Sequence, residues 1–397
     1  VWTMFSIIGI KIKQELSLSD TQFGLLVATP ILTGSISRLP LGIMTDRFGG
    51  RIVFFIQMLL VALPTYGLAF ADQYWHYLVI GLFVGLAGGS FAIGITYTSA
   101  WFEHRRQGTA MGIFGAGNAG AAITNLVAPL IVVSFGWRMV PQIYSLAMIC
   151  MAIIFWLFTF PDPKQLERDR TGTHFRLADQ LAPLKEMRVW RFGIYYFFVF
   201  GGFVALALWL PKYYVGEYGL DLKTASLITM CFTLPSGLIR AFGGWLSDKY
   251  GARHVNWLVF WVSLICLFLV SYPQTTYIVH GISGDHTFYI GSNIWFFTFL
   301  IFVIGIAQGI GKASVYRIIH DYYPNNMGSV GGLVGVIGGL GGFVLPILFG
   351  LASDFLDIRT SCFMLLFGVV ALCMIMMHIS IRNMRQKSGL ELTENFT

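Results

Sequence analysis

The stretch TGSISRLPLGIMTDRFGGR, from Thr33 to Arg51, decides the fold of this chain because a version of it occurs twice. It aligns without a gap with PSGLIRAFGGWLSDKYGAR, from Pro235 to Arg253, at an offset of 202 residues. The paired positions are Arg38 and Arg240, Gly42 and Gly244, Asp46 and Asp248, Arg47 and Lys249, Gly49 and Gly251, and Arg51 and Arg253. The repeat indicates that the chain is built from two related halves.

The composition is that of a membrane protein. Of the 397 residues, 56% are hydrophobic and only 11% are charged, and the mean hydropathy is +0.70. A soluble domain carries about a quarter charged residues. The apolar runs are long and continuous, which favours membrane-spanning helices over the short alternating strands of a barrel. We therefore expect an all-α membrane protein.

The apolar runs between charged breaks predict twelve transmembrane helices in two sets of six. The first set covers about residues 1–11, 21–45, 52–72, 76–101, 108–134 and 138–160, and the second about 190–215, 222–247, 254–272, 291–317, 328–352 and 360–381. Because Val1 already lies inside an apolar run, we expect the first helix to be truncated, with residues missing before it.

These spans predict two pseudo-symmetric six-helix bundles, related to each other by the sequence repeat. We interpret residues 1–160 and 189–384 as the bundles, 161–188 as a cytoplasmic connector and 385–397 as a cytoplasmic tail. A shorter polar stretch, about 273–290, falls on the opposite side of the membrane.

The Lys and Arg residues predict the orientation. Seventeen of the 26 fall on the side that holds the connector and both termini, and six fall on the other side. Both termini of this multi-pass protein are therefore expected in the cytoplasm, with the chain in the cytoplasmic (inner) membrane. This bias also explains most of the net charge of +7, so we predict no nucleic-acid partner.

The remaining three cations, Arg38, Arg240 and Lys312, fall within predicted spans. Arg38 precedes Asp46 by eight residues, which is about 12 Å along a helix and places the arginine well inside the membrane. A charge at that depth is costly and suggests function. No acid lies near either arginine in its own span, so an alternative role as a structural ion pair would need an acid from another span. The pair favours a small anion between the halves, because planar guanidinium matches a planar oxyanion.

Glycine-dense runs occur in both halves, at Gly115–Pro129 and Gly332–Pro346, and let helix backbones approach closely. Asn118 stands among the first of these as an amide that can donate to an anion. No nucleophile–base pair, metal-ligand set or phosphate loop is found, and the five cysteines form no motif. We therefore expect neither an enzyme nor a metal or other cofactor.

These segments together resemble the nitrate/nitrite porter family, NarK type, of the major facilitator superfamily, over essentially the whole chain. They are RLPLGIMTDRFGGR, GLAGGSFAIG, GAGNAGAAITNLVAP, FVFGGF, RAFGGWLSDKYGAR and GGLGGFVLP. The pattern from Gly42 to Arg51 resembles the superfamily motif between spans two and three. The resemblance implies a conformational-switch motif at Gly42, Asp46, Arg47 and Arg51, repeated at Asp248, Lys249 and Arg253.

The resemblance also implies which residues bind the substrate. In the family, the two arginines that match Arg38 and Arg240 bind nitrate. A tyrosine whose hydroxyl donates to the substrate and a phenylalanine one turn later match Tyr196 and Phe200. The other matching positions are Phe91, Asn118 and, in the first span, Phe5. Without the resemblance, these aromatic residues would more often be core residues.

Lys312 departs from the repeat, because an offset of 221 places it at the position of Phe91. One interpretation is a lysine that extends to the cytoplasmic interface. The other is a proton-coupling residue, because a buried lysine can lose its proton. His320 and Asp321 are weaker candidates. The segments GIGKASVYR, AGNAGAAITN and LTGSISRLPLG are closer to the family's nitrate/proton symporters than to its nitrate/nitrite exchangers.

We therefore expect a monomeric secondary transporter that moves nitrate across the lipid bilayer with protons, by rocker-switch alternating access. Nitrite is a second candidate substrate. Nitrate/nitrite antiport is the alternative within the family. An anion channel, or a membrane sensor that binds nitrate without moving it, is the alternative from another class.

Overall fold

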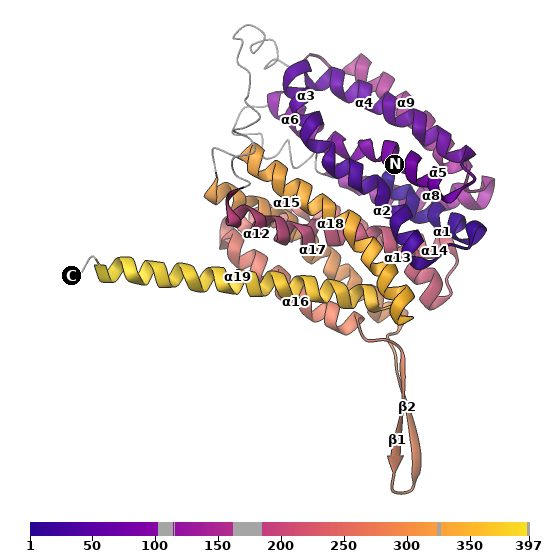
Figure 1. Cartoon of the computed structure of the whole chain (residues 1–397), viewed down its shortest axis with the longest axis vertical. Coiled ribbons are helices and arrows are strands. Elements are labelled where there is room, and N and C mark those ends of the chain that lie inside the picture. Colours follow the sequence, from indigo (N-terminus) through magenta and orange to yellow (C-terminus); the bar gives the residue numbers. More distant parts are fainter. Residues whose placement is uncertain (102–113, 115, 162–184, 324–326, 395–397) are drawn as a thin grey trace.

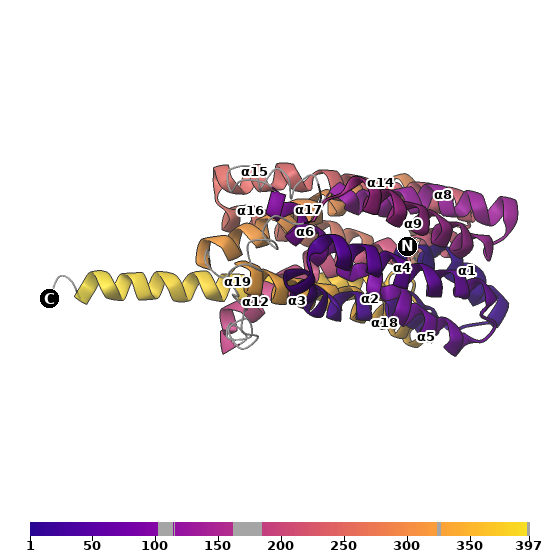
Figure 2. The same ribbon diagram turned by 90° about the horizontal axis from the view of Figure 1, so that it is seen from above.

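A computed structural model describes residues 1–101, 114, 116–161, 185–323 and 327–394, and the structural statements below concern these residues. Its helices run in a common direction in both views (Figures 1 and 2). A β-hairpin leaves one end of the bundle, and the last part of the C-terminal helix projects beyond the other end (Figure 1). We call these the hairpin end and the tail end.

The first part of the chain, coloured indigo to purple in Figure 1, forms one group of helices. Its elements are η1 (Trp2–Met4), α1 (Phe5–Leu16), α2 (Asp20–Ile36), α3 (Arg38–Phe48), α4 (Gly50–Gly67), η2 (Leu68–Phe70), α5 (Tyr74–Gly85), η3 (Leu86–Gly89), α6 (Ser90–Trp101), η4 (Ala116–Ala119), α8 (Gly120–Phe135) and α9 (Met139–Phe158).

The second part of the chain forms the other group. Its elements are α12 (Met187–Tyr196), the π-helical turn η6 (Phe197–Gly201), α13 (Gly202–Tyr218), α14 (Leu222–Leu238), α15 (Arg240–Tyr250), α16 (Ala252–Val270), β1 (Thr275–Gly281), β2 (Gly284–Ile290), α17 (Ile294–Tyr322), α18 (Met327–Leu356) and α19 (Ser361–Glu394).

The prediction of a helical membrane-spanning fold is confirmed. Among the described residues, eight helical segments are long and apolar enough to cross a membrane, and the bent pair α14–α15 would make a ninth. A helix occupies the described part of every predicted span, although the total of twelve stays a prediction. Residues 108–113 and most of the predicted connector lie outside the described ranges. The predicted tail begins within a helix, because α19 continues through residue 385 to Glu394.

Residues 275–290 form a β-hairpin that the sequence analysis did not predict, within an otherwise helical fold. Here β1 and β2 pair antiparallel, with Thr275 opposite Ile290 and Gly281 opposite Gly284. Glycines bound the tight turn, and Gly284 adopts φ +130°, a conformation that side chains other than glycine rarely take. The flanking runs TTYIVHG and GDHTFYI are rich in β-branched and aromatic residues, which favour strands.

Two predicted spans are broken at matching positions. The span of Arg38 breaks between α2 and α3, and the span of Arg240 breaks between α14 and α15, where the two axes differ by 46°. In the first span, Pro40 has no N–H to continue the helical ladder back to Ile36. Each arginine is consequently the first residue of a new helix, which is a local match to the sequence repeat.

The two groups of helices meet mainly through α2 against α18, α8 against α14, and α1 against α13. The α2–α18 contact depends on glycines. A Cβ atom on Gly24 would lie 2.2 Å from the carbonyl oxygen of Pro346, and one on Gly350 would lie 2.3 Å from that of Asp20. The glycine-rich sequence of α18 therefore lets the two backbones touch.

Replacement of Gly24 by alanine should lower the melting temperature of the detergent-solubilised protein by several degrees. The added methyl group collides with backbone, which cannot rotate away, and overpacking of this kind costs about 1–3 kcal/mol. Differential scanning fluorimetry would measure the shift. Gly368→Ala is the matched control, because a Cβ atom there meets nothing within 4 Å. Equal melting temperatures for both variants would contradict this packing.

Candidate functional site

A cavity of about 430 Å³ lies where the two groups of helices meet. Its lining comes from both parts of the chain. Arg38, Gln57, Phe91, Phe114, Tyr196, Phe200, Phe203 and Arg240 are among the lining residues. The structure thus brings together five of the predicted site residues, which are up to 202 positions apart in sequence: Arg38, Phe91, Tyr196, Phe200 and Arg240.

The two arginines of the repeat face a common aromatic ring. The guanidinium carbon of Arg38 lies 5.9 Å from the centre of the Phe91 ring, and that of Arg240 lies 5.8 Å from the same centre. Arg38 is also 5.2 Å from the ring centre of Phe200. These are cation–π distances, at which the negative faces of the aromatic rings attract the guanidinium groups. The rings therefore provide part of the stabilisation that carboxylates would otherwise provide.

Hydrogen bonding within the described part of the chain leaves donors of both arginines unused. Nη1 of Arg38 donates to the carbonyl oxygen of Gly335 at 3.1 Å. Nε of Arg38 and Nη1 of Arg240 are buried and have no hydrogen-bond partner among these residues. None of the ion pairs found there includes either arginine. Buried cationic donors need acceptors, so this arrangement is suited to a small anion.

Tyr196 and Phe200 form one wall of the cavity. Their rings stack at 5.1 Å with an angle of 9° between planes, and the π-helical turn η6 sets this spacing. Such turns occur often at functional sites. Gly338 on α18 makes room for the wall, because a Cβ atom there would lie 2.3 Å from Cδ1 of Tyr196.

Tyr316 on α17 belongs to the same cluster and was missed by the sequence analysis. Its ring meets that of Tyr196 edge-on at 5.1 Å and lies 5.9 Å from the guanidinium carbon of Arg240. Its hydroxyl donates to the carbonyl oxygen of Gly331 at 3.0 Å. Tyr316 follows Lys312 by one helical turn, and this spacing is the only sequence signal that could have placed it near the site.

Lys312 is buried, with 1% of its surface exposed. Its Nζ donates to Oγ of Ser236 at 3.0 Å and lies 3.2 Å from the centre of the Phe203 ring. None of the ion pairs within the described ranges includes it. The interpretation of Lys312 as a lysine that extends to the aqueous interface was therefore wrong. The structure places a third cation in the interior, beside a residue that lines the cavity.

Two predicted site residues are placed differently from the others. Phe5 is fully buried in the core beside Gly81 and is not among the cavity-lining residues; Trp2 and Thr3 line the cavity instead. The structure therefore does not bring Phe5 to this cavity, and its contact with the substrate stays a prediction. Asn118 lies in η4, but its side chain is outside the described residues. No group of three or more described His, Cys, Asp or Glu residues could hold a metal.

The second copy of the switch motif ties helices together at the tail end. Asp248 on α15 pairs with Nε of Arg317 on α17 at 2.7 Å, and Arg253 on α16 donates to the hydroxyl of Tyr322. Lys249 lies 5.1 Å from the ring centre of Trp245.

The first copy of the motif is described only in part. Arg51 on α4 donates to the carbonyl oxygen of Trp156 on α9 at 2.6 Å and lies over the indole ring. Gly42 lies in α3, where a Cβ atom would meet nothing within 4 Å. The side chains of Asp46 and Arg47 are outside the described residues.

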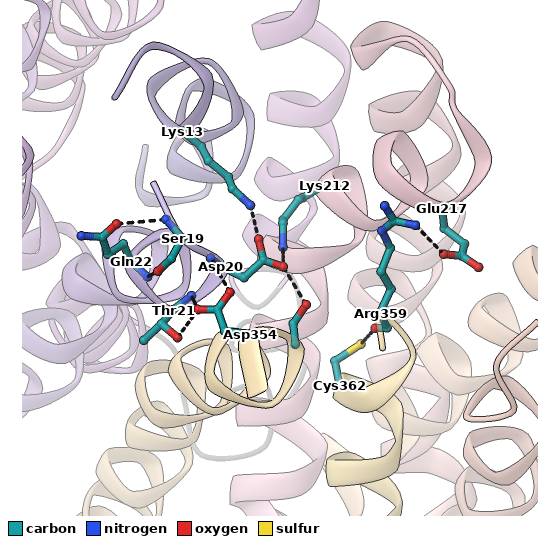
Figure 3. A network of polar contacts seen from close by, with 11 residues as sticks. Lys13, Ser19, Asp20, Thr21, Gln22, Lys212, Glu217, Asp354, Arg359 and Cys362 are labelled. Carbon is teal, nitrogen blue, oxygen red and sulfur yellow. Dashed lines mark hydrogen bonds and ion pairs between the residues drawn. The ribbon is translucent and has the colours of Figure 1, made fainter. Parts of the chain in front are cut away.

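The hairpin end carries a polar network that joins the two groups of helices (Figure 3). Asp20, the first residue of α2, pairs with Lys13 of α1 and, at 2.6 Å, with Lys212 of α13. Its other contact is with the hydroxyl of Ser353 on α18, at 2.7 Å. One carboxylate therefore bridges helices from both parts of the chain.

Asp354 of α18 completes this network, which we call the latch: Lys13, Asp20, Thr21, Lys212, Ser353 and Asp354. The backbone N–H groups of Asp20 and Thr21 donate to its carboxylate at 2.9 Å and 2.7 Å. Asp354 thus neutralises the positive N-terminal end of α2 from across the interface. We infer that the latch holds the molecule closed at the hairpin end.

Replacement of Asp20 by asparagine should open the hairpin end more often, because it leaves Lys13 and Lys212 without their shared counter-ion. A cysteine at Ala207, which lines the cavity, would report this by its rate of reaction with a membrane-impermeant maleimide. The exposed cysteines Cys150 and Cys231 would first be replaced by serine. We expect labelling from the hairpin side to accelerate several-fold.

Asp72→Asn is the matched control for the latch. It breaks the 3.0 Å ion pair with Arg138 but leaves the latch intact. If both variants label at the parent rate, the latch does not hold the hairpin end closed.

Comparisons with known proteins agree with this architecture. Two solved structures share the fold at 14% identity. A bacterial homologue of the human lysosomal transporter Spinster has a TM-score of 0.72 and covers 96% of this chain and 93% of its own. The nucleoside transporter NupG has a TM-score of 0.70, with 95% and 96% covered.

Sequence relatives cover nearly the whole chain. A protein of Thermus thermophilus named "Probable nitrate/nitrite antiporter NarK1" is 39% identical over 100% of this chain and 91% of its own. The "Nitrite extrusion protein" of Bacillus subtilis (strain 168) is 30% identical over 89% and 83%. A "Probable nitrate transporter NarT" of Staphylococcus epidermidis is 28% identical over 96% and 92%.

The family model described as Major Facilitator Superfamily matches residues 1–284 and 221–394. This superfamily consists of transporters and not of enzymes. Together with the relatives, the match confirms the resemblance found in the sequence: the chain belongs to the nitrate/nitrite porter family of the major facilitator superfamily.

Proposed function

We propose that this protein takes up nitrate together with protons across the cytoplasmic membrane. The proposal depends on two arginines, Arg38 and Arg240, that line one cavity between the two groups of helices. Each has a buried N–H donor without a partner in the described part of the chain. Nitrate is planar and delocalised, so its oxygens can accept from both guanidinium planes. The names of the relatives support the same substrate.

Transport would follow from alternating access about this cavity. We assign the hairpin end to the periplasm and the tail end to the cytoplasm, as the distribution of Lys and Arg favours. The C-terminal helix leaves the bundle at the tail end, whereas Val1 lines the central cavity, so a cytoplasmic N-terminus stays a prediction. The bundles 1–160 and 189–384 would rock about the cavity as rigid units, joined by the connector 161–188 and followed by the tail 385–397. The latch would open to admit nitrate and close behind it. The transporting unit in this proposal is the monomer, since residues from both parts of one chain line the described cavity.

Lys312 is the residue proposed to couple proton movement to nitrate. Arg38 and Arg240 line the cavity, and Lys312 lies beside the lining residue Phe203. Like charges that are close together disfavour one another. A nitrate ion bound near Arg240 would favour the protonated form of the lysine, and its departure would favour release of the proton. Binding of the two ions would therefore be mutually favourable, which is the thermodynamic requirement for symport.

Nitrate/nitrite exchange is the second candidate function. The printed name of the Thermus thermophilus relative favours it. In an exchanger, the two arginines would repel each other without an anion, so the carrier could return only when loaded. The two functions differ in whether a proton gradient alone drives net uptake.

Uptake of nitrate into proteoliposomes that contain neither nitrate nor nitrite tests the proposal, with and without an inward proton gradient. We expect the parent protein to accumulate nitrate several-fold with the gradient. Lys312→Arg keeps the positive charge but cannot release its proton at accessible pH. That variant should lose accumulation but retain exchange of external for internal nitrate. Lys223→Ala, which changes an exposed lysine, is the control.

Each outcome has a separate meaning. Uptake that requires internal nitrite would show exchange and would refute symport. Accumulation by Lys312→Arg at the parent level would show that another residue carries the proton. Flux that neither saturates nor responds to counter-ions would indicate an anion channel.

A further inference from the structure

The β1–β2 hairpin exposes more apolar surface than water alone favours. Tyr277, Ile278 and Val279 of β1 are between 43% and 60% exposed, as are Phe288 and Ile290 of β2, and Tyr289 is 65% exposed. Ile282, in the turn, is fully exposed. Exposed apolar side chains that gather on one face of a folded protein mark a binding surface.

The register of the strands separates this surface into two unlike faces. Directly paired residues share a face, and faces alternate along each strand. Tyr277 pairs with Phe288, and Thr275 pairs with Ile290, so these residues share one face with Val279 and His286. We call it the apolar face.

The opposite face is more polar. It holds Thr276, Ile278, His280, Asp285, Thr287 and Tyr289. His280 pairs with Asp285 across the strands at 2.6 Å, and the hydroxyl of Tyr289 donates to Gln274 at 2.5 Å. The hairpin is therefore amphipathic across its thickness, as a segment lying between water and hydrocarbon must be.

The position of the hairpin points to the bilayer as the occupant of the apolar face. The strands project sideways from the bundle, across the direction of the helices and not along it (Figure 1). They begin beside the ends of α16 and α17, whose outer surfaces expose Phe268, Leu269, Trp295, Phe296 and Phe299. Aromatic residues at helix ends mark the membrane interface, so the strands begin at the level of that interface.

Charge excludes recognition by ion pairing. Between Tyr272 and Ile294 there is one acidic residue, Asp285, and there is no lysine or arginine. The hydroxyls of Tyr272 and Tyr277 also contact each other, which ties the apolar face to the chain leaving α16. An uncharged amphipathic segment held at this level fits the boundary between headgroups and acyl chains, where Tyr and Phe rings are favourable.

We propose that the hairpin lies flat in the interface of the leaflet at the hairpin end, with its apolar face against the acyl chains. Each seven-residue strand reaches about 23 Å from the bundle. Anchored in the interface in this way, the hairpin would resist tilting of the second group of helices when the first group moves. This proposal does not depend on the transported substrate.

Spin labels on adjacent residues provide the test, because neighbours in a strand point to opposite faces. After Cys150 and Cys231 are replaced by serine, single cysteines would be placed at Val279 and Phe288 on the apolar face, and at the matched neighbours Ile278 and Thr287. Each labelled protein would be reconstituted in phosphatidylcholine vesicles. Collision of the label with oxygen reports lipid, and collision with a water-soluble nickel complex reports water.

We expect the ratio of oxygen to nickel collisions to be several-fold higher at residues 279 and 288 than at 278 and 287. Equal, high nickel collision at all four positions would place the hairpin in water and overturn the proposal. The apolar face could instead be protected from the nickel complex only at high protein density in the lipid, with magnetic coupling between labels. That result would show a second copy of the chain as the occupant and would also overturn the proposal.

Discussion

The rest of the structure depends on the cost of holding two guanidinium groups inside the membrane. Neither group has a carboxylate partner among the described residues. Insertion of one arginine at the centre of a membrane helix costs about 2.5–3.5 kcal/mol, and two like charges near each other add to this. Phe91 and the carbonyl oxygen of Gly335 reduce the cost, but donors of both arginines stay unused. An anion in the cavity would accept hydrogen bonds from both arginines at once.

The surrounding architecture serves to bring these two groups together from separate parts of the chain. Each arginine begins a new helix after a break, and the glycines of α18 let that helix lie against both α2 and the Tyr196 wall. The latch joins the same two groups of helices at the hairpin end. The contacts that form the site and the contacts that join the helices at the hairpin end therefore belong to the same interface.

A site residue could be predicted from the sequence only where its immediate neighbours in the chain made it stand out. Arg38 and Arg240 were found from the repeat alone, because a charge within an apolar run is conspicuous. The placement of Phe91, Tyr196 and Phe200 came from the family resemblance, since a chain with 35 phenylalanines and 17 tyrosines gives no local reason to select them. For the same reason Tyr316 was missed. Trp2 lines the cavity but was not chosen, because no sequence signal shows that η1 precedes α1.

The latch and the hairpin were not predicted, for two different physical reasons. Asp20 and Asp354 lie 334 residues apart, so no spacing rule connects them, and only the packed fold shows that they meet. The hairpin is encoded locally, by alternating β-branched and aromatic residues between glycines. It was read only as a polar loop, because the hydropathy criterion that identifies spans averages over longer windows than a seven-residue strand.

The most direct test of the central claim is the affinity of the purified protein for nitrate, measured by calorimetry for the parent, Arg38→Lys, Arg240→Lys and the double variant. Lysine keeps the charge but loses the planar pairing. If both arginines bind one ion, each single change should weaken binding at least about tenfold, equivalent to roughly 1.4 kcal/mol. The double variant should then lose less than the two single effects combined, because the changes act on one shared ion. Parent-level affinity in either single variant would contradict the account.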